Sequence, residues 1–224
     1  KPFLWGAPGT VLLTGVYEAY FWAVTGLDPT AHAASVAGTY QLYSFGPWER
    51  MMSQWRVVWL YVGLIVWPMP GLFALEHDLA PSVSLLSPAT TLSSFIGILG
   101  LLVVAVMVWR RWRPLSFLVF WFLGNLALES SFLPLDMVFE HRAYLPSFGV
   151  VGAVVYIAYL LFRSFRWGRW VCFPAVLVVA AMLSAGTRQV NATFASERTV
   201  WENVVRVSPW SGRAWFSLGW IDYF

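Results

Sequence analysis

The chain is poor in charged residues: Asp, Glu, Lys and Arg make up 11% of its 224 residues, whereas 59% are hydrophobic. Soluble domains typically carry about 25% charged residues. A water-soluble protein of this size could not cover so much apolar surface, because its own exterior needs polar groups. The composition therefore excludes an ordinary soluble domain and predicts a protein whose solvent is largely lipid.

Cysteine is almost absent too. Cys172 stands alone inside an apolar run, which excludes an internal disulfide, and no Cys/His pattern has metal-ligand spacing. We therefore expect no metal and no cofactor. The net charge of +3 does not indicate a nucleic-acid partner, because the basic residues form small clusters beside apolar runs instead of one polar face.

Long apolar runs predict transmembrane helices, which need roughly 17–25 residues to cross the hydrocarbon. A shorter run, 57–67, is stopped by Pro68 and Pro70, so we expect 40–70 to form an interfacial or re-entrant helix. The expected spans are about 8–26, which carries Glu18, 93–109, 115–131, 147–162 and 170–186.

Arginines predict the orientation of these spans. Turns rich in Arg are cytoplasmic by the positive-inside rule, which puts the loop 132–147 and the chain after 187 outside. An alternative has 8–26 and 57–67 both spanning, with Lys1 outside. The two basic turns contain Arg110, Arg111 and Arg113, and Arg163, Arg166 and Arg169.

The predicted fold is all-α: a polytopic transmembrane helix bundle over 1–188, followed by a polar helical tail over 189–224. In the tail, valines recur at helical spacing up to Val207, and Pro209 ends that helix. Ser211 is the expected N-cap of a second helix.

A polar cluster at 129–147 is the richest candidate site. Ionisable groups at a membrane edge are costly and commonly face a cavity or a partner. Arg and His beside carboxylates could hold a phosphate by charge-assisted hydrogen bonds. A salt-bridged loop that caps the bundle would explain the same cluster. Its members are Glu129, Asp136, Glu140, His141, Arg142 and Tyr144.

Other isolated polar residues have structural interpretations. Glu18 is expected to reach the interface or to pair with another helix. Glu76, His77 and Asp78 are adjacent, so their side chains diverge and make a poor metal site. We expect these three residues and His32 to be solvated loop residues.

The segment LPLDMVFEHRAYLPSFG resembles the outer-loop motif of bacterial membrane proteins that carry tetratricopeptide (TPR) repeats. These are similar to the transmembrane–TPR protein O-mannosyltransferases and, more broadly, to the GT-C glycosyltransferases. Two further segments agree with this resemblance. The family's Pro-broken helix before an outer loop resembles MSQWRVVWLYVGLIVWPMPG, and its passage into the repeats resembles ERTVWENVVRVSPWSGRAWFSLGWIDYF. The resemblance covers roughly residue 40 to the end.

The TPR match is partial. Trp215, Leu218 and Gly219 fit the W-x2-L-G pattern, but Asp222 stands where an aromatic is expected, with Tyr223 one residue later. Because neighbouring repeats bury each other's faces, further repeats are expected downstream. The chain is then the C-terminal half of the family's membrane domain with the start of its repeats.

The resemblance implies transfer of a sugar from a polyprenyl-phosphate carrier to an extracytoplasmic acceptor, by a multi-pass enzyme of the inner (plasma) membrane with a periplasmic TPR tail. Its partners would be the carrier, membrane lipid and proteins bound by the TPRs. The family places its catalytic acid in the first outer loop, which nothing here matches: Asp28, in LDP, lacks the acidic pair. The catalytic residue is therefore unassigned. The implied carrier-phosphate residues are Glu140, His141, Arg142 and Tyr144, supported by Asp136 and Glu129.

Other functions stay open. A non-catalytic scaffold whose TPRs recruit proteins, or an accessory subunit of a larger membrane complex, fits a chain without the acidic loop equally well. A transporter is disfavoured, because the sequence shows no internal repeat and no broken helices in matching positions.

Overall fold

The computed structural model describes residues 45–130, 136–163 and 168–223, together with Ala23, Gly26, Gly38 and Tyr40. The chain divides into two compact units, Lys1–Pro47 and Trp48–Phe224, and the helices described below belong almost entirely to the second. The predicted span 8–26, with Glu18, lies mostly outside the described residues, as do Asp28 and His32.

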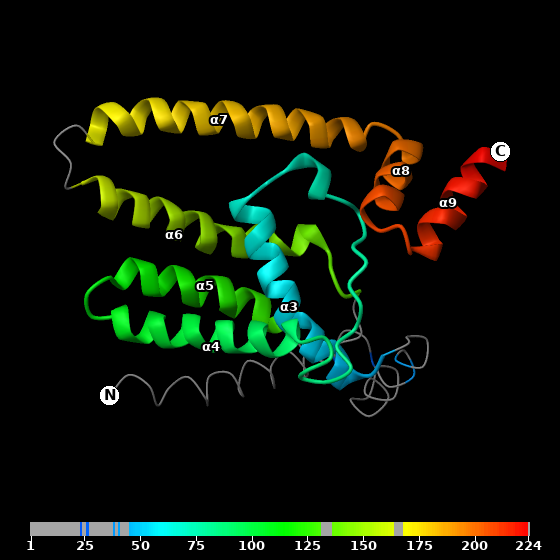
Figure 1. The fold of residues 1–224 in the computed structure, drawn as a ribbon, viewed down its shortest axis with the longest axis horizontal. Coiled ribbons are helices and arrows are strands. Elements are labelled where there is room, and N and C mark those ends of the chain that lie inside the picture. The colour runs from blue at the N-terminus through cyan, green and yellow to red at the C-terminus, as the bar shows by residue number, and fades with distance from the viewer. Residues whose placement is uncertain are drawn as a thin grey trace. The chain divides into compact units, whose positions relative to one another are not determined.

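All regular secondary structure in the described part of the chain is helical, as predicted (Figure 1). Four helices cover the central apolar runs: α4 (Thr90–Val108), α5 (Arg113–Glu129), α6 (Tyr144–Phe162) and α7 (Gly168–Thr193). Three segments among the described residues are long and apolar enough to cross a membrane, namely Thr90–Val108, Glu140–Phe162 and Phe173–Thr193. The structure is thus compatible with a membrane protein.

Helices α4, α5 and α6 are sequential neighbours that pack side by side (Figure 1). Between α4 and α5, the buried Ser116 hydroxyl donates a 2.6 Å hydrogen bond to the Ala105 carbonyl. Between α5 and α6, glycine allows close contact, because a Cβ at Gly149 would lie 2.5 Å from the Leu118 carbonyl oxygen. Small residues at such contacts are typical of helix packing in membranes.

Helix α3 (Pro47–Val66) ends before Pro68, because proline cannot continue the hydrogen-bonding pattern. It is longer than the predicted apolar run 57–67 and begins with a polar half that contains Arg50 and Gln54, both buried. It is not among the three membrane-length apolar segments of the described chain. Its interfacial or re-entrant placement stays a prediction.

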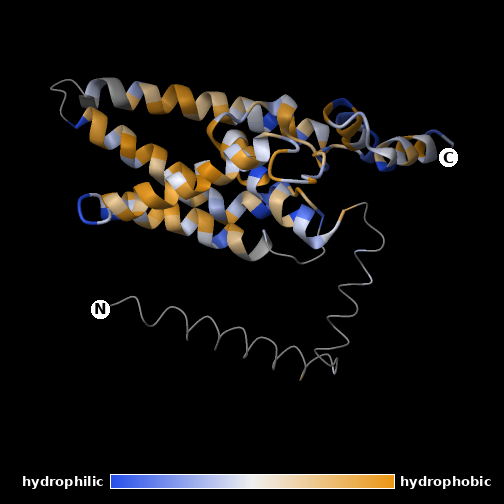
Figure 2. Cartoon of the chain, turned by 60° about the horizontal axis from the view of Figure 1, so that its bottom comes forward, coloured by the Kyte–Doolittle hydropathy of each residue, from blue (hydrophilic) through white to orange (hydrophobic). Residues whose placement is uncertain are grey.

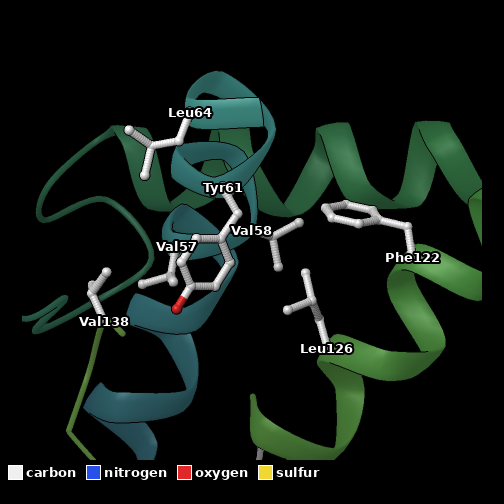
Figure 3. Close-up of a cluster of buried hydrophobic side chains, with 7 residues drawn as sticks. All are labelled: Val57, Val58, Tyr61, Leu64, Phe122, Leu126 and Val138. Atoms are coloured by element: carbon white, nitrogen blue, oxygen red, sulfur yellow. The ribbon is translucent and has the colours of Figure 1, made fainter. Parts of the chain in front are cut away.

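The hydrophobic core forms where the second half of α3 packs against α5 (Figure 3). Burying a large apolar side chain contributes about 1.5–3 kcal/mol, so this cluster is a major source of stability. It also fixes the segment that precedes α6, because Val138 belongs to it. The buried residues are Val57, Val58, Tyr61, Leu64, Phe122, Leu126 and Val138.

The connection between α3 and α4 contains the short 3-10 helix η1 (Pro70–Leu72), and its second half is anchored by buried hydroxyls. The Ser82 amide donates to the Ser53 hydroxyl of α3 at 2.7 Å. The Thr91 hydroxyl of α4 donates to that of Ser82 at 2.8 Å. The loop is therefore bound to both helices that it joins.

The polar tail forms two helices, α8 (Glu197–Val207) and α9 (Gly212–Tyr223). As predicted, the first ends before Pro209 and Ser211 caps the second, where its hydroxyl accepts from the Ala214 amide at 3.1 Å. Arg198 of α8 lies 3.0 Å from Asp222 of α9. The hydrogen bond to Glu202 and the charge of Asp222 raise the pKa of Arg198, which stays protonated.

Helix α7 continues without a break to Thr193. It therefore passes through residue 188, where the membrane bundle was predicted to end, and α8 begins four residues after α7 ends. The tail is joined to the bundle by a short connection.

Candidate functional site

The predicted site residues lie on the 3-10 helix η2 (Glu140–Ala143), which leads directly into α6. A 3-10 helix has three residues per turn, so consecutive side chains point in different directions. Glu140 is directed toward the α3–α4 connection, where its partners lie. His141 and Arg142 both contact the Phe139 ring, and Tyr144 is 85% exposed. Glu140 therefore does not join the other three residues, of which His141 and Arg142 share the Phe139 ring.

Glu140 has a structural partner that the sequence did not indicate. Its Oε1 accepts hydrogen bonds from His77 Nε2 at 2.7 Å and from the Ala74 amide at 2.8 Å. The side chains of His77 and Glu140 are only 10% and 22% exposed. The expectation that His77 is a solvated loop residue was therefore wrong, because Glu140 pairs with it across 63 positions of sequence.

Arg142 is held differently. Its Nη1 donates a 2.8 Å hydrogen bond to the main-chain carbonyl of Asp136, and its guanidinium lies 4.9 Å from the centre of the Phe139 ring. The side chain is partly exposed, whereas His141, whose ring centre lies 5.1 Å from that of Phe139, is exposed. The structure thus presents two basic side chains around one aromatic ring, within reach of solvent or a ligand.

Of the two supporting residues predicted from sequence, only Asp136 has a side chain that the structure describes. Asp136 is exposed and offers its main-chain carbonyl to Arg142, so its carboxylate does not make that contact. The Glu129 side chain lies outside the described part of the structure.

Helix α3 positions the chain just before η2. The Tyr61 hydroxyl donates to the Phe139 carbonyl at 2.9 Å and accepts from the Phe139 amide at 3.1 Å. Gln54 Nε2 donates to the Met137 carbonyl at 2.8 Å. Because extended backbone needs partners for its amides and carbonyls, these two side chains replace a neighbouring strand and hold Phe139 in place.

Residues 73–78, which we call the connecting segment, also bind the tail. The Asn203 side-chain amide donates to the Phe73 carbonyl at 2.7 Å. The buried Ser208 hydroxyl accepts from the Asp78 amide and donates to the Glu76 carbonyl, both at 2.9 Å. These bonds satisfy the backbone of an irregular segment.

Glu76 makes the charged part of this contact. Its Oε2 accepts from the Ser211 hydroxyl at 2.8 Å, and its Oε1 lies 3.9 Å from Arg213. Like His77, Glu76 was expected to be solvated, and this too was wrong. The connecting segment therefore contacts η2 through His77 and Ala74, and the α8–α9 tail through Glu76 and its backbone.

Sequence reasoning missed the connecting segment because its partners are distant along the chain. The one local signal was the position of Asn203, which is adjacent to the buried Val204 on α8 and is only 4% exposed. A polar side chain beside a core position predicts a hydrogen-bonded contact, although not its partner.

Among the described residues, no group of three or more His, Cys, Asp or Glu side chains is arranged to hold a metal ion. The polar groups at the η2 turn are the Glu140 carboxylate, the His141 imidazole, the Arg142 guanidinium and the Tyr144 phenol. Comparison with protein-family models, curated proteins and solved structures finds no match to this chain. A functional assignment must therefore come from the chain's own residues and geometry.

Proposed function

We propose that this chain forms the carrier-binding part of a membrane glycosyltransferase that transfers a sugar from a polyprenyl-phosphate carrier to an acceptor outside the cytoplasm. The observation that supports it best is the position of Arg142. Arg142 lies in the first turn of the membrane-length apolar segment Glu140–Phe162, and its side chain is partly exposed. A lipid carrier has the same arrangement, with a phosphate at one end of a long hydrocarbon.

In this proposal the phosphate contacts come from His141, Arg142 and Tyr144. The acceptor's nucleophile attacks the anomeric carbon, and the bond from that carbon to the phosphate oxygen breaks. The carrier phosphate leaves with the electron pair, and Arg142 and His141 stabilise its developing charge. The base that removes the acceptor's proton is not assigned.

Glu140 takes another role in this proposal. A carboxylate repels a phosphate, and Glu140 already accepts two hydrogen bonds from the connecting segment. We therefore assign it to positioning: it fixes the 3-10 turn that carries His141 and Arg142. Its loss should reduce transfer only by loosening that turn.

The proposed topology has α4, α5, α6 and α7 all crossing the inner membrane, with the arginine-rich turns cytoplasmic and the tail periplasmic. Hydrophobic residues predominate along these helices (Figure 2). Val106, Val155 and Met182 are 64%, 61% and 70% exposed, as expected for helices surrounded by lipid. In this topology α8 and α9 begin a TPR array.

The test is sugar transfer from a polyprenyl-phosphate donor by the purified full-length protein. Arg142→Ala should lose about 2–4 kcal/mol of transition-state stabilisation, or roughly 30- to 900-fold in rate. Arg142→Lys should lose less than Arg142→Ala, because lysine keeps the positive charge. It should still lose some rate, because lysine cannot form the bidentate hydrogen bonds of a guanidinium. The matched control is Arg206→Ala on α8, an exposed arginine whose loss should leave transfer unchanged. Normal transfer by a folded Arg142→Ala variant would remove Arg142 from the site.

A second candidate function is a non-catalytic scaffold or accessory subunit. It is favoured by the aromatic face of α9, where Phe216, Trp220 and Tyr223 are 71%, 58% and 80% exposed, as on a protein-binding surface. If the full-length protein transfers no sugar from any polyprenyl-phosphate donor, and Phe216→Ala disrupts a complex isolated from cells, this function is the better one.

A further inference from the structure

Acidic residues are absent from two long stretches of this chain. Residues 79–128 and 141–196 contain no Asp or Glu, and the α4–α5 and α6–α7 turns lie within them. Both turns are basic, and the C-terminal end of α6 lies at the same end of the bundle as the α4–α5 turn (Figures 1 and 2), because α4, α5 and α6 alternate in direction. The positive charge at this end has no counter-charge nearby in sequence.

The described part of the structure does not provide a counter-charge either. Arg110, Arg111 and Arg113 of the α4–α5 turn are exposed, as is Arg163 at the end of α6. Within 45–130, 136–163 and 168–223, no side-chain hydrogen bond or ion pair engages these four guanidinium groups. These exposed guanidinium groups are therefore available to an anion from outside the described residues.

The surroundings restrict the kind of anion. Trp109 and Trp112, which flank the arginines, are 51% and 38% exposed, and Trp109 is steadied by an edge contact with Phe120 at 6.1 Å. Tryptophan favours the boundary between hydrocarbon and headgroups. One turn away on α4, Val106 and Met107 are 64% and 75% exposed, which suits contact with acyl chains.

We propose that the α4–α5 turn, together with Arg163, binds the headgroups of anionic phospholipids. The guanidinium groups bond the lipid phosphate, the indoles lie at the headgroup level, and the acyl chains follow the apolar surface of α4. This site is separate from the one around Arg142. The 19 residues of α6 lie between them, about 28 Å at 1.5 Å per residue. The proposal therefore does not depend on the glycosyltransferase assignment.

The test compares phosphatidylglycerol and phosphatidylcholine of identical acyl chains, bound to the detergent-solubilised chain and counted by native mass spectrometry. Each basic residue near an anionic surface strengthens binding about fivefold. We expect wild-type protein to prefer phosphatidylglycerol, and Arg110→Gln/Arg111→Gln to weaken its binding by about 25-fold while phosphatidylcholine binding stays unchanged. Added salt should reduce the preference.

Two further variants keep the test decisive. Arg206→Gln/Arg213→Gln in the tail removes the same charge and should leave the preference unchanged. If Arg110→Gln/Arg111→Gln does not fold, Arg163→Gln alone should weaken phosphatidylglycerol binding about fivefold. Equal binding of the two lipids by wild-type protein, or an equal loss in the tail variant, would overturn the proposal. Displacement of phosphatidylglycerol by excess inorganic phosphate would show a site for free anions instead of lipid.

Discussion

Replacing Glu140 with alanine tests the contact between η2 and the connecting segment. The substitution removes the acceptor of two hydrogen bonds, from the Ala74 amide and from His77. Ala74 is 1% exposed and the His77 side chain 10%, so water cannot readily replace the lost oxygen. Hydrogen bonds to a charged group contribute about 1.5–3 kcal/mol each. Since Glu140 is itself partly exposed, we expect a total loss of about 2–4 kcal/mol.

Thermal unfolding of the detergent-solubilised chain should show this loss as a lower melting temperature. One kcal/mol shifts Tm by about 2–4 °C in a chain of this size, so the expected decrease is about 4–16 °C. Hydrogen exchange measured by mass spectrometry should show faster exchange of the peptide that contains residues 73–78. Glu140→Gln should lose less, because its amide oxygen still accepts hydrogen bonds.

Two controls separate this contact from a general effect of the substitution. Asp136→Ala removes an exposed carboxylate close by and should change stability by less than about 0.5 kcal/mol. A double-mutant cycle with His77→Ala should give a coupling energy of about 1–2 kcal/mol. If Glu140→Ala unfolds at the wild-type temperature and residues 73–78 exchange no faster, the contact does not stabilise the protein and our reasoning on Glu140 fails.

Three more predictions follow from other contacts. Gly149→Ala should destabilise the chain by about 1–3 kcal/mol, because the added Cβ would collide with α5. The control Gly124→Ala has open space around it and should stabilise α5 by about 0.5–1 kcal/mol. Equal Tm values for the two variants would refute the close packing of α5 and α6. Glu76→Ala should release the Ser211 hydroxyl and raise hydrogen exchange at the start of α9 about five- to thirtyfold, corresponding to about 1–2 kcal/mol; an unchanged rate would mean that the tail does not depend on this carboxylate. In intact cells, an impermeant thiol reagent should label a cysteine at Asp136 but not one at Arg111, and the opposite pattern would reverse the proposed orientation.

The helices were predictable because their signals are local. Apolar runs of membrane length gave α4 to α7 to within a few residues at most ends, and Pro68 and Pro209 marked where α3 and α8 end. The polar first half of α3 was harder to predict, since Arg50 and Gln54 are buried by tertiary contacts that no apolar pattern reveals. The continuation of α7 past residue 188 was missed because returning polar residues do not by themselves end a helix.

The candidate site was only partly predictable. The sequence indicated the cluster around Arg142, but not that Glu140 turns away from it toward His77. Glu76 and His77 look solvated because exposure is the usual state of charged loop residues, and their neighbour Asp78 is indeed exposed. The side-chain partners of Glu76 and His77, Ser211 and Glu140, come from more than 60 residues away, and only the fold brings them together.

The central claim is that the η2 turn binds the phosphate of a polyprenyl carrier, and photo-crosslinking tests it most directly. A polyprenyl-phosphate analogue with a photoreactive group near the phosphate would be added to the full-length protein in nanodiscs, and the labelled peptides identified by mass spectrometry. We predict labelling of residues 136–148, strongly reduced in Arg142→Ala, partly retained in Arg142→Lys and unchanged in Arg206→Ala. Equal labelling of the same peptide in wild-type protein and in a folded Arg142→Ala variant, or labelling confined to other parts of the chain, would contradict the claim.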